Sequence, residues 1–332
     1  MEYRNLGKAG LKVPLLSLGT GTFGGTNEFF KKWGQTDVKE AARLIDICIE
    51  RGVNFFDTAN VYSQGASEEI LGKALKGKRN EVLISTKATY KMGNGPNDSG
   101  SSRHHILKEC EASLRRLETD HIDLYFMHGF DNTTPIEETL KALDMLVSSG
   151  KVNYIGCSNF AAWQLMKSLS VSERNRLEQY VIYQGYYSLI GRDYEQELMP
   201  LIKDQQMGLM AWSPLGWGRL TGKIRRNTPT GEGRIKAGGD VGSPPVDMEM
   251  IYNVVEAMEE ISRETGRSIP QIAINWLKYN PTVSNIIIGA RNETQLIDNL
   301  EATDFTLTKE QLEKLDQLTS PHLIYPHWVG DR

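Results

Sequence analysis

The chain has 332 residues, of which 39% are hydrophobic and 24% are charged, and its formal net charge at pH 7 is −4. These ordinary proportions exclude a disordered or fibrous class, because they supply enough apolar residues for a packed core. The net charge is mild and no basic stripe occurs, so the sequence lacks the clustered positive charge that binds nucleic acid or an anionic membrane surface. We therefore expect a small-molecule partner, and neither nucleic acid nor a membrane.

The three cysteines, Cys48, Cys110 and Cys157, lie far apart and show neither zinc-site spacing nor the even count of a disulfide framework. The N-terminus lacks the apolar stretch of a signal peptide, and no run of about eighteen apolar residues occurs. We predict a cytoplasmic protein in a reducing compartment, with no metal site.

The first sixteen residues contain a turn from Gly7 to Gly10 between two short extended segments, which predicts a β-hairpin ahead of the main fold. After it, short apolar runs typical of strands alternate with amphipathic stretches typical of helices. The predicted strands are 15–19, 53–56, 82–86, 122–127, 152–157, 181–184, 208–211 and 285–288. The predicted helices are 38–51, 67–76, 102–117, 136–149, 161–169 and one that begins near 293.

Strands that alternate with helices indicate parallel βαβ units, either in a closed barrel or in a doubly wound open sheet. The run from Gly19 to Gly24 has the Gly-x-Gly-x-x-Gly spacing of an open dinucleotide-binding sheet, but a loop containing Trp33 follows it instead of an immediate helix. The count of eight strands favours the barrel. We predict an α/β fold, a (β/α)8 TIM barrel with an N-terminal β-hairpin and a C-terminal helical tail, as one domain over residues 1–332.

Four polar residues stand at or just after the ends of three successive predicted strands, which share one face of a barrel. Tyr62 can protonate a carbonyl oxygen, and the Lys87 ammonium would lower its pKa. Asp57 would keep Lys87 charged, and His128 would orient the carbonyl. Each residue alone has a structural interpretation, as a cap, a rim aromatic, a solvated lysine or a core histidine. Their joint placement favours catalysis.

Three segments carry a family resemblance: NFFDTANVYS at 54–63, ISTK at 84–87 and IDLYFMH at 122–128. They resemble the aldo-keto reductase superfamily, with its complete Asp-Tyr-Lys-His tetrad, and the likeness continues from the hairpin to Gly289-Ala290-Arg291. The resemblance implies reduction of a small aldehyde or ketone with NADPH/NADP⁺ as cofactor.

The resemblance also implies that the cofactor lies extended across the barrel mouth. Gly21, Thr22 and Phe23 match its first wall. Three further residues, Ser158, Asn159 and Gln184, match those that hydrogen-bond the nicotinamide carboxamide. Trp212 matches the residue that stacks on the nicotinamide ring.

The stretch 212–223 resembles the family's pyrophosphate loop, in which small residues let backbone amides approach phosphate oxygens. Its matching residues are Ser213, Pro214, Leu215, Gly216, Gly218 and Lys223. A lid is expected at approximately 217–245, because long loops in compact domains are usually functional or disordered. Arg234 in this lid would reach the pyrophosphate, or else remain a solvated surface arginine.

A predicted strand end meets a helix start between 288 and 299, which is a natural anion site. The family's better-known pattern has a lysine and a second arginine where this chain has Gly289 and Gln295. Arg291 can grip a phosphate with its planar fork, so we expect it to bind the adenosine 2′-phosphate and to favour NADPH. Asn299 completes this expected group of cofactor residues.

The expected mouth is aromatic, which favours an apolar carbonyl substrate. Its candidate side chains are Phe23, Trp33, Tyr62, Tyr90, Phe130, Trp212, Trp217 and Trp328. A different function stays open, since the superfamily includes NADPH-binding regulatory subunits of potassium channels; the intact His128 favours turnover. A metal-dependent barrel hydrolase has less support, because no cluster of histidines and carboxylates stands at the strand ends. The sequence favours neither a monomer nor an oligomer.

Overall fold

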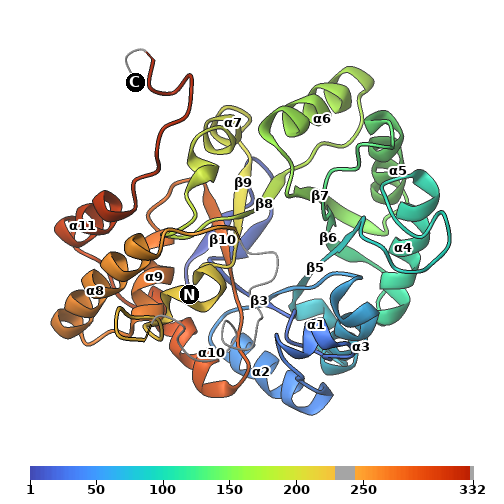
Figure 1. Ribbon diagram of the computed structural model, residues 1–332. Coiled ribbons are helices and arrows are strands. Elements are labelled where there is room, and N and C mark those ends of the chain that lie inside the picture. The colour runs from blue at the N-terminus through green and yellow to red at the C-terminus, as the bar shows by residue number, and fades with distance from the viewer. Residues whose placement is uncertain (229–243, 330–332) are drawn as a thin grey trace.

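The computed structural model describes residues 1–228 and 244–329, in which parallel strands close into a barrel ringed by helices (Figure 1). The strand order is β10-β3-β4-β5-β6-β7-β8-β9, so neighbours in the chain are neighbours in the barrel and β10 closes against β3. This order confirms the predicted TIM barrel and excludes the open sheet. The barrel strands are β3 Leu16–Gly19, β4 Phe55–Asp57, β5 Leu83–Ala88, β6 Ile122–Met127, β7 Val152–Ser158, β8 Ile182–Tyr186, β9 Gly208–Trp212 and β10 Val283–Ile288.

The outer helices form where the sequence is amphipathic and carries a capping residue. In α2, Leu44 and Ile45 face the barrel, while the Asp37 side chain accepts from the amide of Glu40 at the helix start. Ser102 caps α4 in the same way. The helices are α1 Glu28–Lys31, α2 Val38–Glu50, α3 Ala66–Ala74, α4 Arg103–Arg116, α5 Ile136–Ser148, α6 Ala162–Asn175, α7 Leu198–Asp204, α8 Met248–Thr265, α9 Ile269–Leu277, α10 Glu293–Leu300 and α11 Lys309–Thr319.

The barrel interior is a packed apolar core below the mouth. In β6, Leu124 and Phe126 point inward, and they alternate with residues that pack under the helices. The hairpin of β1 Tyr3–Asn5 and β2 Lys12–Pro14 closes this end, since Leu6 and Val13 are buried in the interior cluster. The predicted hairpin is thus confirmed, and it covers the end of the barrel opposite the mouth.

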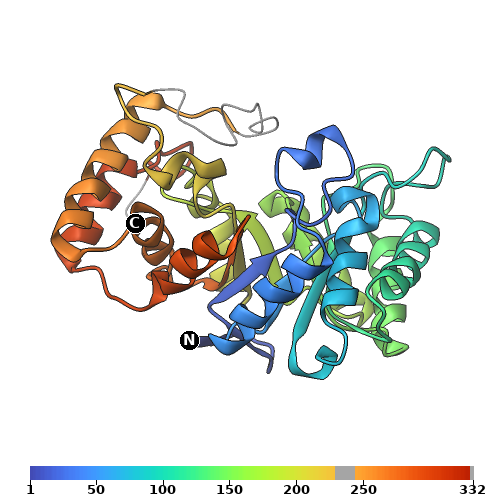
Figure 2. The same ribbon diagram turned by 90° about the horizontal axis from the view of Figure 1, so that it is seen from below.

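The loops that follow the strands gather at the other end of the barrel. Figure 2 shows the loop with α1 and the short 3₁₀ segment Gly216–Thr221 rising at one end, away from the N-terminus. The predicted lid falls largely on 229–243, and Arg234 lies outside the described residues. In the part of the chain that the structure describes, no helix is both long enough and apolar enough to cross a membrane.

Several predicted boundaries need correction. Helix α6 continues to Asn175 instead of ending at 169, because its later residues Val171 and Ser172 are also buried. No immediate helix follows the glycines, as predicted, but their loop contains the unpredicted one-turn helix α1, whose first turn is capped by the Asn27 side chain. Lys87 lies inside β5, which extends to Ala88.

Candidate active site

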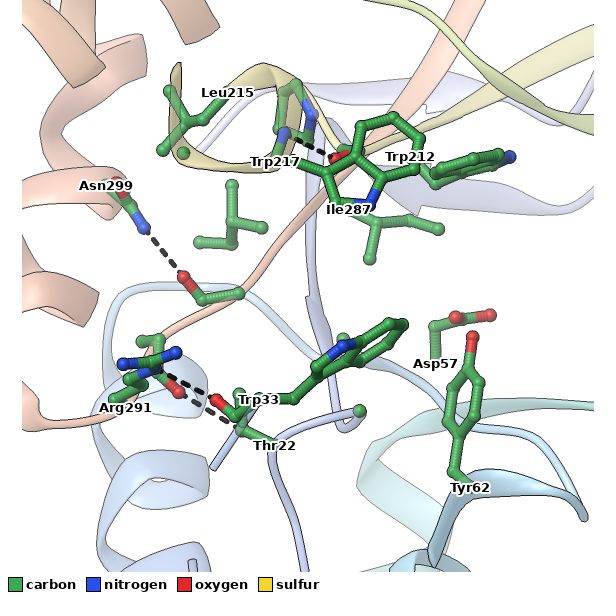
Figure 3. Close-up of a pocket in the computed structure, with 18 of the residues that line it drawn as sticks. Thr22, Trp33, Asp57, Tyr62, Trp212, Leu215, Trp217, Ile287, Arg291 and Asn299 are labelled. Atoms are coloured by element: carbon green, nitrogen blue, oxygen red, sulfur yellow. Dashed lines mark hydrogen bonds between the residues drawn. The ribbon is translucent and has the colours of Figure 1, made fainter. Parts of the chain in front are cut away.

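A cavity of about 870 Å³ opens at the carboxyl ends of the strands. It extends from Asp57 and Tyr62 on one side to Arg291 and Asn299 on the other (Figure 3). The structure therefore brings residues of the expected proton-transfer site and of the expected phosphate site to one continuous hollow. We call these two sides the proton end and the phosphate end.

The proton end is built on a buried ion pair between neighbouring strands. Lys87 Nζ donates to Asp57 Oδ2 at 2.7 Å and to the carbonyl of Thr58 at 2.6 Å, and the two charged side chains are 0% and 3% exposed. Ser85 donates to Asp57 Oδ1 at 2.6 Å and the Gln184 amide donates to the same oxygen at 3.0 Å. Fixed donors thus surround the carboxylate, as a buried charge requires.

The charges around Lys87 decide its protonation. Burial lowers the pKa of its ammonium, but the adjacent Asp57 carboxylate and Tyr62 outweigh burial, so the pKa stands above its ordinary value. Lys87 is therefore charged at neutral pH, as the sequence predicted. It is enclosed behind Asp57 and Tyr62 and does not line the cavity.

Tyr62 begins the 3₁₀ segment Tyr62–Gly65 and lines the cavity, with its ring centre 5.1 Å from Lys87 Nζ. Burial raises the pKa of its phenol, and the positive charge of Lys87 offsets only part of this rise. The expectation of a lowered pKa is corrected: the ammonium does act in the predicted direction, but burial is the larger effect. Tyr62 consequently holds its proton at neutral pH.

His128 follows β6 directly and faces the same part of the cavity. Its ring centre lies 5.8 Å from that of Tyr62 and 4.7 Å from that of Tyr90. Burial, together with the charge of Lys87, holds the pKa of the imidazole well below its usual range. Its buried Nδ1 has no hydrogen-bond partner within residues 1–228 and 244–329. A neutral histidine with an unused polar atom is suited to hydrogen-bond a bound polar group.

The residues matched to nicotinamide binding lie beside the proton end. Ser158, Asn159, Gln184 and Trp212 all line the cavity. Asn159 donates from its side chain to the His128 carbonyl at 2.9 Å, and its backbone adopts a left-handed φ of 59°. The Gln184 amide nitrogen is already directed at Asp57, so this residue also supports the ion pair.

The stretch matched to pyrophosphate binding has an unusual backbone. Gly216, Trp217 and Gly218 have successive φ values of 52°, 60° and 90°, a left-handed run that favours glycine. A Cβ on Gly216 would meet Cδ1 of Ile190 at 2.6 Å, so a larger residue here would also displace the end of that side chain. It does not line the cavity, whereas the other matched residues do: Ser213, Pro214, Leu215, Gly218 and Lys223.

At the phosphate end, Gly289, Arg291, Gln295 and Asn299 all line the cavity. The Arg291 amide donates to Gln295 Oε1 at 3.0 Å, and the Asn299 side chain donates to the Gly289 carbonyl at 3.0 Å. These contacts order the turn between β10 and α10. The predicted cation thus stands at a helix start, a favourable place for an anion.

The expected first wall and aromatic mouth are only partly correct. Gly21 and Thr22 line the cavity, but Phe23 is 0% exposed and belongs to the core. Phe130 instead packs on Phe160, at 5.1 Å between ring centres, and Trp328 is 62% exposed on the tail. The aromatic residues that do line the cavity are Phe29, Phe30, Trp33, Tyr62, Tyr90, Trp212 and Trp217.

Ser85, Phe29 and Phe30 belong to the site but were not predicted from the sequence. A signal for Ser85 exists, because it precedes Lys87 by two residues in a strand and so faces the same side. Phe29 and Phe30 carry no comparable signal, since they reach the cavity only through the path of a loop. No group of His, Cys, Asp or Glu within the described ranges is arranged to hold a metal ion.

Comparison with known proteins gives a family and two kinds of relative. The model of the aldo/keto reductase family matches residues 16–320. A probable voltage-gated potassium channel subunit beta from Oryza sativa subsp. japonica is 38% identical over 324 residues, which cover 95% of this chain and 96% of the relative. The uncharacterized oxidoreductase YrpG from Bacillus subtilis (strain 168) is 38% identical over 330 residues, 96% of each chain. The L-glyceraldehyde 3-phosphate reductase of Escherichia coli (strain K12) is 31% identical over 328 residues, covering 96% of this chain and 92% of the relative.

Proposed function

The chain belongs to the aldo/keto reductase family of oxidoreductases that act on carbonyl groups, and from this premise we propose that it reduces aldehydes or ketones with NADPH. The main support for this function is the buried Asp57–Lys87 ion pair, which lies beside Tyr62 at the wall of the cavity. An ammonium held next to a phenol favours proton donation to a carbonyl oxygen, because it stabilises the phenolate that remains.

The cavity residues fit a nicotinamide dinucleotide. His128 and Trp212 line the cavity, and each has a buried polar atom without a partner in the described ranges, Nδ1 of His128 and Nε1 of Trp212. A cation, Arg291, lies at the phosphate end. Ser158, Asn159 and Trp212 would hold the nicotinamide, and Arg291 would hold the 2′-phosphate. When bound, the reduced nicotinamide supplies the hydride for the carbonyl carbon.

The residues of the proton end donate the proton, stabilise the resulting charge and position the carbonyl. Tyr62 donates its hydroxyl proton to the carbonyl oxygen, and the Lys87 ammonium stabilises the phenolate that remains. Asp57 keeps Lys87 charged and in place through the 2.7 Å contact. Neutral His128 hydrogen-bonds the carbonyl oxygen and so positions it near Tyr62. The raised pKa of Tyr62 suits this role, because an acid must hold its proton until the substrate arrives.

The substrate we propose is an apolar aldehyde or ketone. Phe30 and Trp33 lie with their ring centres 6.1 and 6.4 Å from that of Tyr62, so aromatic surface borders the reacting position. Such surface favours apolar groups attached to the carbonyl.

A second candidate is a regulatory subunit that binds NADPH with little turnover, as the 38% identity to the rice channel subunit suggests. One experiment separates the two. The protein is mixed with excess NADPH and a panel of aldehydes that includes aromatic ones, and the absorbance of NADPH is followed. Many turnovers per chain are expected. Tight NADPH binding with no more than a single turnover across the panel would favour the regulatory subunit instead.

A further inference from the structure

The loop between β3 and α2, residues 20–37, builds one wall of the proton end. It carries Phe30 and Trp33, whose rings lie near Tyr62, and the Trp33 ring packs over Gly21 so closely that a Cβ there would meet it at 3.1 Å. The base of the loop is fastened by the Thr22 hydroxyl, which donates to the carbonyl of Ala290 at 3.2 Å. The position of Trp33 at the tip therefore affects the shape of the substrate space.

The tip of this loop is held by a side chain from the phosphate end. Arg291 Nε donates to the carbonyl of Trp33 at 2.9 Å, and Nη2 donates to the carbonyl of Lys32 at 2.6 Å. Figure 3 shows the Arg291 guanidinium directed toward the Trp33 segment. Arg291 makes no ion pair with Glu293, which pairs with Arg43 of α2 instead. The guanidinium thus connects the two ends of the cavity through backbone carbonyls.

The geometry of the guanidinium allows it to make a second contact at the same time. Arginine has five N–H donors in a rigid plane, and the loop carbonyls use the edge formed by Nε and Nη2. The other edge, formed by Nη1 and the second N–H of Nη2, also offers two parallel donors and can bind a phosphate in a bidentate way. Loop and phosphate can therefore bind to one arginine without competing for the same donors.

We propose that Arg291 is a positioning residue that holds the aromatic wall of the substrate site and links it to the 2′-phosphate site. Its part toward NADPH rests on the function proposed above, whereas its hold on the loop does not. Because linkage is reciprocal, a phosphate that orders Arg291 also orders the loop, and an ordered loop presents Arg291 to the phosphate. Arg291 then sets the affinity for the aldehyde as well as the preference for NADPH.

Hydrogen exchange of the protein without cofactor tests the hold on the loop. The amides of Lys31, Trp33, Gly34 and Thr36 donate hydrogen bonds within the loop and report its opening. Arg291→Ala should speed exchange in a peptide covering residues 28–36 by about tenfold or more, since hydrogen bonds from a charged donor are lost. Arg43→Ala is the matched control, because it removes another exposed arginine beside α10 that does not touch these carbonyls. Equal exchange in parent and Arg291→Ala would overturn the proposal.

The substrate side is tested with NADH, which has no 2′-phosphate. Arg291→Ala should raise the KM for an aromatic aldehyde with saturating NADH as donor, while Arg43→Ala should leave this KM near the parent value. An unchanged KM in Arg291→Ala would confine Arg291 to phosphate binding and overturn the link. If the parent protein reduces no aldehyde at all, the proposed function fails, and the exchange experiment still decides whether Arg291 holds the loop.

Discussion

The two ends of the cavity hold their charges in opposite ways. At the proton end, Lys87 and Asp57 are almost completely buried and are fixed by side chains from barrel strands. At the phosphate end, Arg291 is exposed and is fixed by backbone carbonyls of a surface loop. Burial strengthens the interactions between charges and shifts pKa values, whereas solvent and salt weaken the interactions between exposed charges. We therefore expect changes at the proton end to affect the chemical step, and changes at the phosphate end to affect cofactor choice.

The largest effect should come from removing the proton donor. Tyr62→Phe keeps the ring against Lys87 and the neighbouring aromatics but deletes the hydroxyl, so kcat should fall by roughly 10²–10⁴. Cofactor affinity should hardly change. Steady-state aldehyde reduction and NADPH titration by tryptophan fluorescence measure the two quantities.

Tyr90→Phe is the matched control for this variant. It also deletes a tyrosine hydroxyl from the cavity wall, next to His128 but outside the buried ion pair. It should lose far less rate than Tyr62→Phe. Equal losses in the two variants would show that a general change in the wall, and not the loss of the donor, lowers the rate.

Removal of Arg291 should change binding without a comparable change in chemistry. Arg291→Ala should weaken NADPH binding by roughly 10- to 150-fold, because hydrogen bonds to a charged group contribute about 1.5–3 kcal/mol. The Kd for NADH should change much less, and the difference between the cofactors should shrink at high salt. Fluorescence titrations of parent and variant give both constants. If the ratio of the two constants stays the same, Arg291 does not bind the 2′-phosphate.

The smallest expected effect concerns stability at acid pH. The pKa of His128 is depressed by burial, so below about pH 6.5 the unfolded chain binds a proton that the folded chain does not. Stability is therefore lost as pH falls through this range, by at most about 1.4 kcal/mol per pH unit for this group. Urea unfolding of parent and His128→Asn at pH 7.5 and 5.5 tests the sign. The variant should lose less stability on acidification, and an equal loss in both would contradict the depressed pKa.

The sequence was most informative where local pattern decides structure. The largely apolar run at 122–127 became β6 with identical bounds, because a strand buried on both faces is rich in apolar residues. Its one charged residue, Asp123, pairs with Arg79. Helix α1 was missed since its single turn depends on the Asn27 cap and on packing of the loop. The burial of Phe23 could not be predicted either, because it follows from the path of the chain after β3 and not from local periodicity.

In the candidate site, too, some features could be predicted from the sequence pattern, and others depend on burial or on contacts between distant segments. The sequence could predict that Asp57, Tyr62, Lys87 and His128 lie together because strand ends in a barrel converge, a property of topology that the alternating pattern reveals. The net direction of the Tyr62 pKa was predicted incorrectly, because it depends on how deeply the phenol is buried. The contact between Arg291 and the Lys32 carbonyl joins positions 259 residues apart, and no local signal in either segment indicates it.

If Lys87 and Tyr62 work as one proton-transfer unit, the effects of substituting them are coupled, and a double-mutant cycle measures that coupling. The kcat values of the parent, Tyr62→Phe, Lys87→Met and the double variant are compared under saturating NADPH and aldehyde, with folding checked by circular dichroism. Lys87→Met removes the ammonium beside the phenol and leaves Asp57 without its partner, so it should also be severely impaired. The double variant should lose little more than the worse single variant, because both changes disable the same step. Losses that multiply in the double variant would mean that the two residues act in separate steps and would place Lys87 in a different role.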